Sequence, residues 1–249
     1  MSAVIIQVDN VAPQAWRNGG GQTRELLVWP VLGSLGGEAL CVGKGGARKA
    51  GGGHEAKRNA AQTPSANQTV PAPATTDWQL RISRADIEAN GPFSSFAGVQ
   101  RWFVVISGNG VVLHMPTPDG HTRDYQLLPG HTPLHFDGGL APGCSLIDGA
   151  TQDLNLMARG GVACMQAVEA DEPWSADFAM RGIYTACSGV WSDGLQTITL
   201  AANTLLWIAN ASALSNTPAK TAFRFTAINT DNTEPPRAWW LGYTPDTST

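Results

Sequence analysis

Short strand-like runs recur along most of the chain, and this recurrence constrains the fold more than any single motif. Apolar and β-branched residues gather in runs about ten residues apart, with Gly, Pro, Asn and Asp between them. Helical periodicity is scarce. The clearest runs are VIIQV, ELLVW, WQLRIS, RWFVVIS, GVVLHM, DYQLL, LHF, TITLA, TLLWIA and FRFTAI. The pattern predicts an all-β protein, built as a sandwich or a barrel.

Two dipeptides predict tight reversals between neighbouring strands. Asn109-Gly110 and Asp119-Gly120 each stand between strand-like runs, and Asn-Gly and Asp-Gly are typical of hairpin turns. We therefore expect an antiparallel meander here. Residues 33–76 break the pattern, because they are rich in Gly, Ala, Pro and Thr and nearly free of large apolar groups. They are predicted to be a flexible surface insertion between two strands.

Charge and cysteine usage narrow the class of protein. The net charge of −4 and the pI near 5.7 argue against a nucleic acid or an anionic membrane surface as partner. No run approaches the roughly 18 apolar residues of a membrane helix, and the N-terminus lacks the features of a signal peptide. Cys41, Cys144, Cys164 and Cys187 form no CxxC pair, which predicts free thiols in a reducing cytoplasm.

The stretch AWRNGGGQTRE, residues 15–25, combines a turn signal with three glycines and several hydrogen-bonding side chains. Glycines permit positive φ and close approach, and consecutive N–H groups can form an anion-binding nest. A plain hairpin loop is the alternative. If a strand follows, Thr23 and Glu25 point to one face and Arg24 to the other. A carboxylate directed into a barrel needs a partner or a ligand.

Two later stretches also place polar side chains on one face of a strand. Arg81 and Ser83 alternate with apolar residues, and Asp153, Asn155 and Met157 share a parity opposite to their leucine neighbours. Such a polar face meets either solvent or a polar cavity. In GPFSSFAGVQR, Phe93 and Phe96 either line a pocket or plug the end of a barrel, and Ser94 and Ser95 can cap a short turn.

Metal and nucleophile chemistry find little support in the sequence. His131 and His135 would share a face in an extended segment, but Pro133 lies between them and no third ligand accompanies them. There is no GxSxG elbow and no phosphate-binding loop. We expect no metal ion and no cofactor.

Four stretches, taken together, resemble the HutD/Ves family. They are WRNGGGQTRE from residue 16, WQLRISRADIEANGPFSSFAGVQRWFVVISGNGVVL from residue 78, LHFDGG from residue 134, and DLNLMARGG from residue 153. The resemblance implies a cupin-like antiparallel β-barrel or sandwich with two barrel-like halves, as in a bicupin. On this basis we expect halves at residues 1–165 and 166–249.

The resemblance also implies a metal-free protein that binds a small carboxylate and regulates or limits histidine utilisation. Formate, urocanate and N-formylglutamate are the ligands that this context suggests, and a homodimer is allowed. The residues carried over as a ligand site are Trp16, Asn18, Gly20, Thr23, Glu25, Arg81, Ser83, Phe93, Ser94, Phe96, Asp153, Asn155 and Met157.

Two other functions stay open on the sequence. One is a cupin-type isomerase or lyase with Glu25 or Asp153 as base and Arg81 as anion clamp. In the binding hypothesis, Arg81 holds the anion, and a structural ion pair between Arg81 and Glu25 is its alternative. The other function is an interaction scaffold, suggested by the exposed-looking RAWWLG near the C-terminus.

Overall fold

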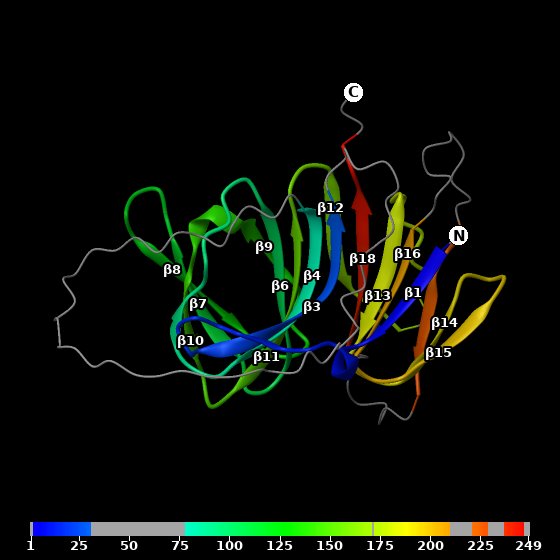
Figure 1. Ribbon diagram of the computed structural model, residues 1–249, viewed down its shortest axis with the longest axis horizontal. Helices are drawn as coiled ribbons and strands as arrows, with labels where there is room; N and C mark the ends of the chain where they lie inside the picture. The colour runs from blue at the N-terminus through cyan, green and yellow to red at the C-terminus, as the bar shows by residue number, and fades with distance from the viewer. Residues whose placement is uncertain (1, 31–77, 171, 210–220, 229–236, 247–249) are drawn as a thin grey trace, which may run out of the picture.

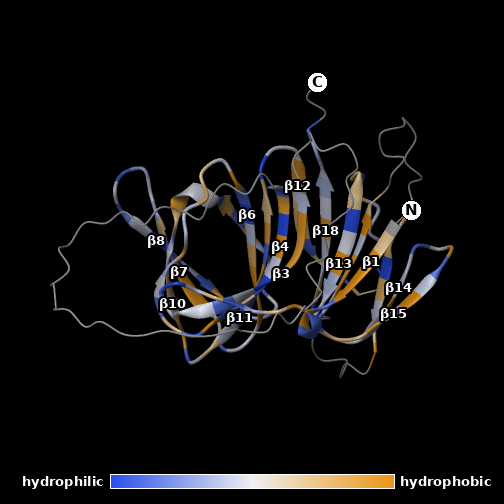
Figure 2. Cartoon of the chain, viewed as in Figure 1, coloured by the Kyte–Doolittle hydropathy of each residue, from blue (hydrophilic) through white to orange (hydrophobic). Residues whose placement is uncertain are grey.

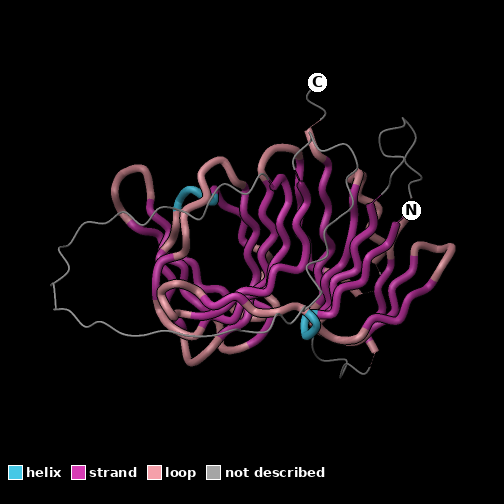
Figure 3. Tube along the Cα trace, viewed as in Figure 1, coloured by secondary structure: helices cyan, strands magenta, loops and turns pink. Residues whose placement is uncertain are grey.

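The computed structural model describes residues 2–30, 78–170, 172–209, 221–228 and 237–246. The expected insertion at 33–76 lies outside these residues. Within them the chain forms antiparallel strands, with no α-helix and two short 3₁₀-helices at Val8–Asn10 and Gly138–Leu140 (Figure 3). The described ranges hold no helix with the length and apolar character needed to cross a membrane. The all-β prediction is confirmed.

Two sheets form the N-terminal half. The larger sheet has the order β2-β3-β4-β11-β6-β9, with strands at Gln14–Ala15, Gly21–Pro30, Trp78–Ile87, Thr151–Ala158, Gln100–Ser107 and Leu134–Asp137. The smaller sheet has the order β5-β10-β7-β8, with strands at Gly91–Pro92, Gly143–Leu146, Val111–Pro116 and Thr122–Leu127.

Two further sheets form the C-terminal half. The larger has the order β1-β16-β13-β18-β12, with strands at Ser2–Gln7, Thr204–Ala209, Met180–Thr185, Ala238–Thr244 and Val162–Ala167. The smaller has the order β15-β14-β17, with strands at Thr197–Leu200, Gly189–Ser192 and Arg224–Ala227. β1, which the expected division at residue 165 assigns to the N-terminal half, pairs with β16 in this second half.

The four sheets stack into layers separated by apolar cores. Figure 1 shows β7, β8 and β10 at one end of the molecule, β14 and β15 at the other, and the two large sheets between them. One core lies inside each half, and a third lies where the two large sheets meet. The described strands form paired sheets rather than closed barrels, so each half is a sandwich.

The six-stranded sheet is covered on both faces because its residues alternate. Leu80 and Ile82 of β4 pack with Trp207 and Trp239 of the C-terminal half, in the core between the large sheets. Arg81, between them, points to the opposite face, toward the four-stranded sheet. Figure 2 shows the resulting change between hydrophobic and hydrophilic positions along the central strands.

A β-bulge in β3 adjusts this alternation. Glu25 pairs with Ser83 and Leu27 with Ile82, so Leu26 is the extra residue. The bulge allows Leu26 and Leu27 both to enter the core between the large sheets. Glu25 therefore keeps the inward direction expected from the sequence.

The two predicted turns have different outcomes. The Asp119-Gly120 turn joins β7 and β8, which pair in one sheet, as expected. The Asn109-Gly110 turn joins β6 to β7, which lie in different sheets, so the expectation of a hairpin between them is wrong. An Asn-Gly signal specifies a tight reversal but not the sheet that the next strand joins.

The NGGG loop is a hairpin between β2 and β3, and its glycines meet separate steric demands. Gly19 has a φ of +70°, and a Cβ at this position would meet nothing within 4 Å. Gly21 has a φ of +156°, and a Cβ there would lie 2.1 Å from the backbone oxygen of Asp86. Close approach of β3 to β4 therefore requires glycine at position 21.

We predict that Gly21→Ala is much more destabilising than Gly19→Ala, the matched control. Gly19→Ala should cost about 1 kcal/mol, because only the left-handed backbone conformation is penalised. Gly21→Ala should cost roughly 3 kcal/mol, because the new Cβ collides with backbone. Urea unfolding of both variants measures the difference. Equal losses would show that the contact with Asp86 does not constrain the loop.

Candidate ligand-binding site

The inner face of the six-stranded sheet presents polar side chains, in rows that also hold apolar ones, toward the four-stranded sheet. Strand register aligns Glu25, Ser83, Asn155 and Phe103 in one row across β3, β4, β11 and β6. The next row contains Val28, Arg81, Met157 and Arg101, and another contains Thr23 and Asp153. The shared direction that the sequence predicted for these side chains therefore converges on one interior.

Arg101 of β6 is the cation buried deepest in this interior. Its residue is 7% exposed, and its Nε donates a hydrogen bond to Asn155 Oδ1 at 2.7 Å. The guanidinium carbon lies 4.5 Å from the ring centre of Phe93, 5.5 Å from that of Phe136 and 5.9 Å from that of Phe103. Burial lowers the pKa of Arg101 to about 10, which leaves it charged at neutral pH.

Asp153 and Asn155 continue from this arginine along β11. Asn155 Nδ2 donates to Asp153 Oδ1, while Asn155 Oδ1 accepts from Arg101. Asp153 is 1% exposed, and burial raises its pKa to about 7, although the charge of Arg101 opposes the shift. Within the described residues no carboxylate lies within ion-pair distance of Arg101. The two charged groups are linked through the amide of Asn155.

Arg81 differs from Arg101 because it has a carboxylate partner. Its Nε lies 2.9 Å from Glu25 Oε2, and both side chains are partly exposed. The contact is an ion pair without hydrogen-bond alignment at that nitrogen. The structure therefore contains the Arg81–Glu25 pair that the sequence left open as an alternative to an anion clamp.

The NGGG loop uses part of its hydrogen-bonding capacity internally. Gly20 N donates to Asn18 Oδ1 at 3.0 Å, and Gly19 N donates to the carbonyl of Trp16, also at 3.0 Å. Trp16 Nε1 donates to Thr23 Oγ1 at 2.7 Å. These N–H groups are thus engaged within the loop, as in the plain hairpin that the sequence left open as the alternative to an anion nest. Trp16 packs at the edge of the N-terminal core.

Of the remaining predicted residues, some are buried in the interior and others lie at the protein surface. Phe93 is buried against Phe103, with ring centres 5.5 Å apart. Phe96 and Met157 pack with Trp78 and Val99 in a small neighbouring cluster. Ser94, like Asn18, is exposed at the surface.

A cavity of about 160 Å³ opens beside this interior, between β7, β8 and β9. Phe136, which contacts the guanidinium of Arg101, also lines the cavity, as do Met115 and Tyr125. Arg123, His135 and Thr117 are among its polar lining residues. Arg101 does not itself line this cavity, and Phe136 is the residue that links the two.

Arg101 is the candidate site residue that the sequence analysis missed. Its strand, RWFVVIS, is mostly apolar, yet Arg101 shares parity with Phe103 and Val105, which are fully buried. A charged residue on the buried parity of a core strand was the available signal.

The cysteines were expected to be free thiols, and His131 and His135 were considered as metal ligands. Cys144, Cys164 and Cys187 are unbridged, and burial raises the pKa of the Cys144 thiol to about 12. His135 Nε2 lies 2.7 Å from Gln100 Oε1, and its ring stacks on Trp102. Across the described ranges, no three His, Cys, Asp or Glu side chains gather closely enough to hold a metal ion.

Solved structures share the fold of this chain. A conserved protein of unknown function from Pseudomonas aeruginosa PAO1 has a TM-score of 0.66 at 22% identity, covering 98% of this chain and 100% of that one. HutD from Pseudomonas fluorescens SBW25 has a TM-score of 0.63 at 20% identity, with the same coverage. An oxalate decarboxylase from Bacillus subtilis has a TM-score of 0.51 at 8% identity, covering 98% of this chain and 78% of that one. The fold is cupin-like.

Sequence comparison gives the family. Protein Ves of Citrobacter koseri is 27% identical over 233 residues, which cover 93% of this chain and 92% of that protein. An uncharacterised 21.2 kDa protein in the hutC 3′ region of Pseudomonas putida is 42% identical over 80 residues, 32% of this chain and 38% of that protein. The sequence profile of the family described as HutD matches residues 60–225. The chain therefore belongs to the HutD family.

Proposed function

We propose that the N-terminal sandwich binds a small carboxylate at Arg101 and that this binding regulates or limits histidine utilisation. The observation that carries the proposal is the buried guanidinium of Arg101, which makes one side-chain hydrogen bond within the described residues. A guanidinium has five N–H donors and suits a carboxylate in a two-point contact. An anionic ligand would use the donors of Arg101 that lack a protein partner, and Phe136 links Arg101 to the neighbouring cavity.

The charges in the interior favour an anion. Glu25 offsets Arg81, which lies 2.9 Å away. Asp153 offsets Arg101 only when it is ionised, and its pKa is about 7 because it is buried. Protonation of Asp153 therefore leaves one uncompensated positive charge in a water-poor interior, where Coulomb attraction is strong.

Two relatives, together with the carboxylate group that the candidate acids share, suggest the class of ligand. HutD from Pseudomonas fluorescens has a structure in a formate condition, and the Pseudomonas putida relative is encoded in the hutC 3′ region. Formate, urocanate and N-formylglutamate each carry a carboxylate. We place the protein in the cytoplasm, where unbridged thiols are stable, and a homodimer belongs to the same proposal.

An isomerase or lyase is the second candidate, because a base with a pKa near neutrality suits general acid–base catalysis. Asp153 has that property. Turnover of any of the three acids would favour an enzyme over a binding protein. The scaffold alternative loses its support, since Trp239 and Trp240 of RAWWLG are each 2% exposed.

We predict that Arg101→Met abolishes carboxylate binding while the protein stays folded. Calorimetry with formate, urocanate and N-formylglutamate, at pH 6, measures the loss, which should be at least ~100-fold for the acid that binds. Arg181→Met is the matched control, because Arg181 is also buried and lies 4.0 Å from the ring centre of Phe223, but in the C-terminal half. Binding in the control should equal that of the parent.

Stability separates this proposal from a structural role for Arg101. A buried charge without an ion-pair partner is costly, so a volume-matched apolar residue should be neutral or stabilising. The free energy of unfolding of Arg101→Met at pH 6 should therefore match or exceed that of the parent. A loss of several kcal/mol together with unchanged binding would contradict the proposal.

We also predict that binding weakens as pH rises through about 7. The ligand carboxylate favours the neutral form of Asp153, whose pKa in the free protein is about 7, so binding takes up a proton. Above this pH the dissociation constant should rise by up to ~10-fold per pH unit. Asp153→Asn should flatten the profile between pH 6 and 8. A parent profile that is already flat would show that Asp153 does not face the ligand.

A further inference from the structure

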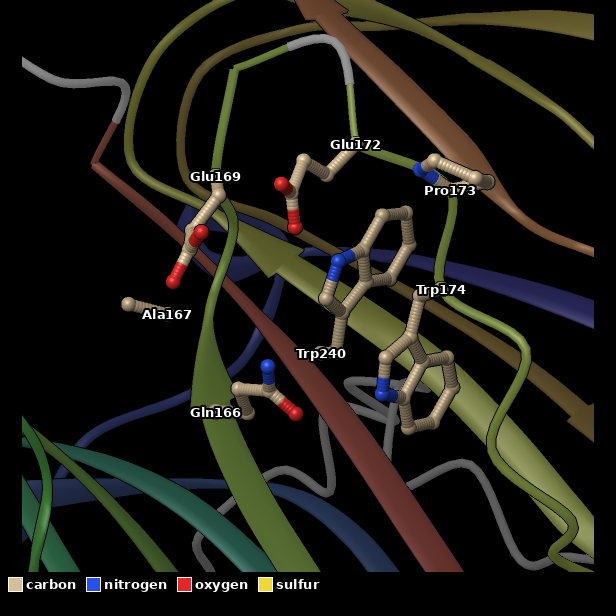
Figure 4. A pocket seen from close by; sticks show the side chains of 7 residues that line it. All are labelled: Gln166, Ala167, Glu169, Glu172, Pro173, Trp174 and Trp240. Carbon is tan, nitrogen blue, oxygen red and sulfur yellow. The ribbon is translucent and has the colours of Figure 1, made fainter.

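A second pocket lies in the C-terminal half, away from the carboxylate site, beside β12 and β18. It has a volume of about 30 Å³ and is lined by Gln166 of β12, Trp240 of β18, and Glu169, Glu172 and Trp174 of the segment after β12 (Figure 4). Its lining combines two indole rings with two carboxylates. This composition is opposite in charge to the arginine-lined interior of the N-terminal half.

The indole wall is held in place by its surroundings. The rings of Trp174 and Trp240 are parallel within 1°, with centres 5.4 Å apart. Trp174 exchanges two backbone hydrogen bonds with Phe223, at 2.7 and 2.8 Å. The two tryptophans are 5% and 2% exposed. The wall is therefore formed before any ligand arrives.

Trp174 leaves a buried donor unsatisfied at this pocket. Its Nε1 is shielded from solvent and has no hydrogen-bond partner among the described residues. In Figure 4 this nitrogen lies on the edge of the ring that faces the Gln166 side of the pocket. The indole nitrogens of Trp191 and Trp207 are also unpartnered, but neither of these residues lines the pocket. A buried N–H without an acceptor is costly, so an acceptor atom in the pocket would be stabilised.

The two carboxylates approach the same wall from one turn. Glu172 N donates to the carbonyl of Glu169 at 3.3 Å, so both side chains leave a single bend of the chain. Figure 4 shows the carboxylate of Glu172 beside the nitrogen-bearing edge of the Trp240 indole, with Glu169 on the far side of Glu172 from that ring. Neither carboxylate has an ion-pair partner among the described residues. A cation placed here would meet the negative charge of two carboxylates beside an aromatic wall.

We propose that this pocket binds a small primary amine that also carries a hydroxyl or carbonyl oxygen. The ammonium group contacts the carboxylates beside the indole wall, and the oxygen accepts the Trp174 N–H. The volume suits two water-sized groups, so these two polar groups enter and the rest of the molecule stays in solvent. Neutral diols lack the charge, and carboxylic acids are repelled.

The test is an NMR titration of the ¹⁵N-labelled full chain at neutral pH, with ethanolamine hydrochloride as the probe. Trp174→Phe identifies the indole N–H signal of Trp174. Ethylene glycol and sodium chloride, at matched concentrations, are the ligand controls. Glu169→Gln combined with Glu172→Gln removes the charge, and Glu88→Gln, an exposed site after β4, is the matched control variant.

Ethanolamine should shift the Trp174 indole signal in a saturable manner, and the double Glu→Gln variant should weaken this by roughly tenfold. Glu88→Gln should behave like the parent. Equal shifts with ethylene glycol, an unsaturable response, or an unchanged affinity in the double variant would each overturn the proposal. Because the probe is not an acid, the result is independent of the carboxylate site.

Discussion

Two-sided burial of the six-stranded sheet is the constraint on which the rest of the structure depends. Along β4, Leu80 and Ile82 face the C-terminal half. Arg81, which lies between them, must therefore face the four-stranded sheet, as must the residues that alternate with this apolar set. The usual antiparallel sheet turns its polar face to solvent. Here a second sheet covers that face, and the polar side chains become the lining of an interior. The apolar contact between the halves and the polar site thus lie on opposite faces of the same strands.

Arg101 places a positive charge inside this interior, which is unfavourable for the stability of a core. A cation in a protein interior is retained at a cost unless a partner compensates it. Asn155 and three phenylalanine rings provide part of that compensation. Arg84, on the other face, shows the contrast, since it pairs with Asp86 at 3.0 Å. The donors of Arg101 that remain free are the physical reason for assigning a ligand to this site.

The sequence predicts this fold and part of its site because alternation is a local property. The shared parity of Asp153, Asn155 and Met157, and the inward direction of Glu25, follow from neighbouring residues alone. Non-local pairing has no such signal, so the position of β1 beside β16 could not be read from its sequence. Arg101 was missed since its neighbours resemble an ordinary core strand. The exposed-looking Trp239 and Trp240 are buried because a neighbouring sheet covers each face of β18.

The central claim is that a carboxylate occupies the interior at Arg101. A crystal structure of the protein grown with N-formylglutamate, and a second with formate, tests it most directly. The account predicts a carboxylate within hydrogen-bond distance of the Arg101 Nη atoms, with the Arg81–Glu25 pair intact and the longer acid extending into the cavity beside Phe136. An acid bound only at the surface, or an interior in which Arg101 swings to form an ion pair with Asp153, would contradict it.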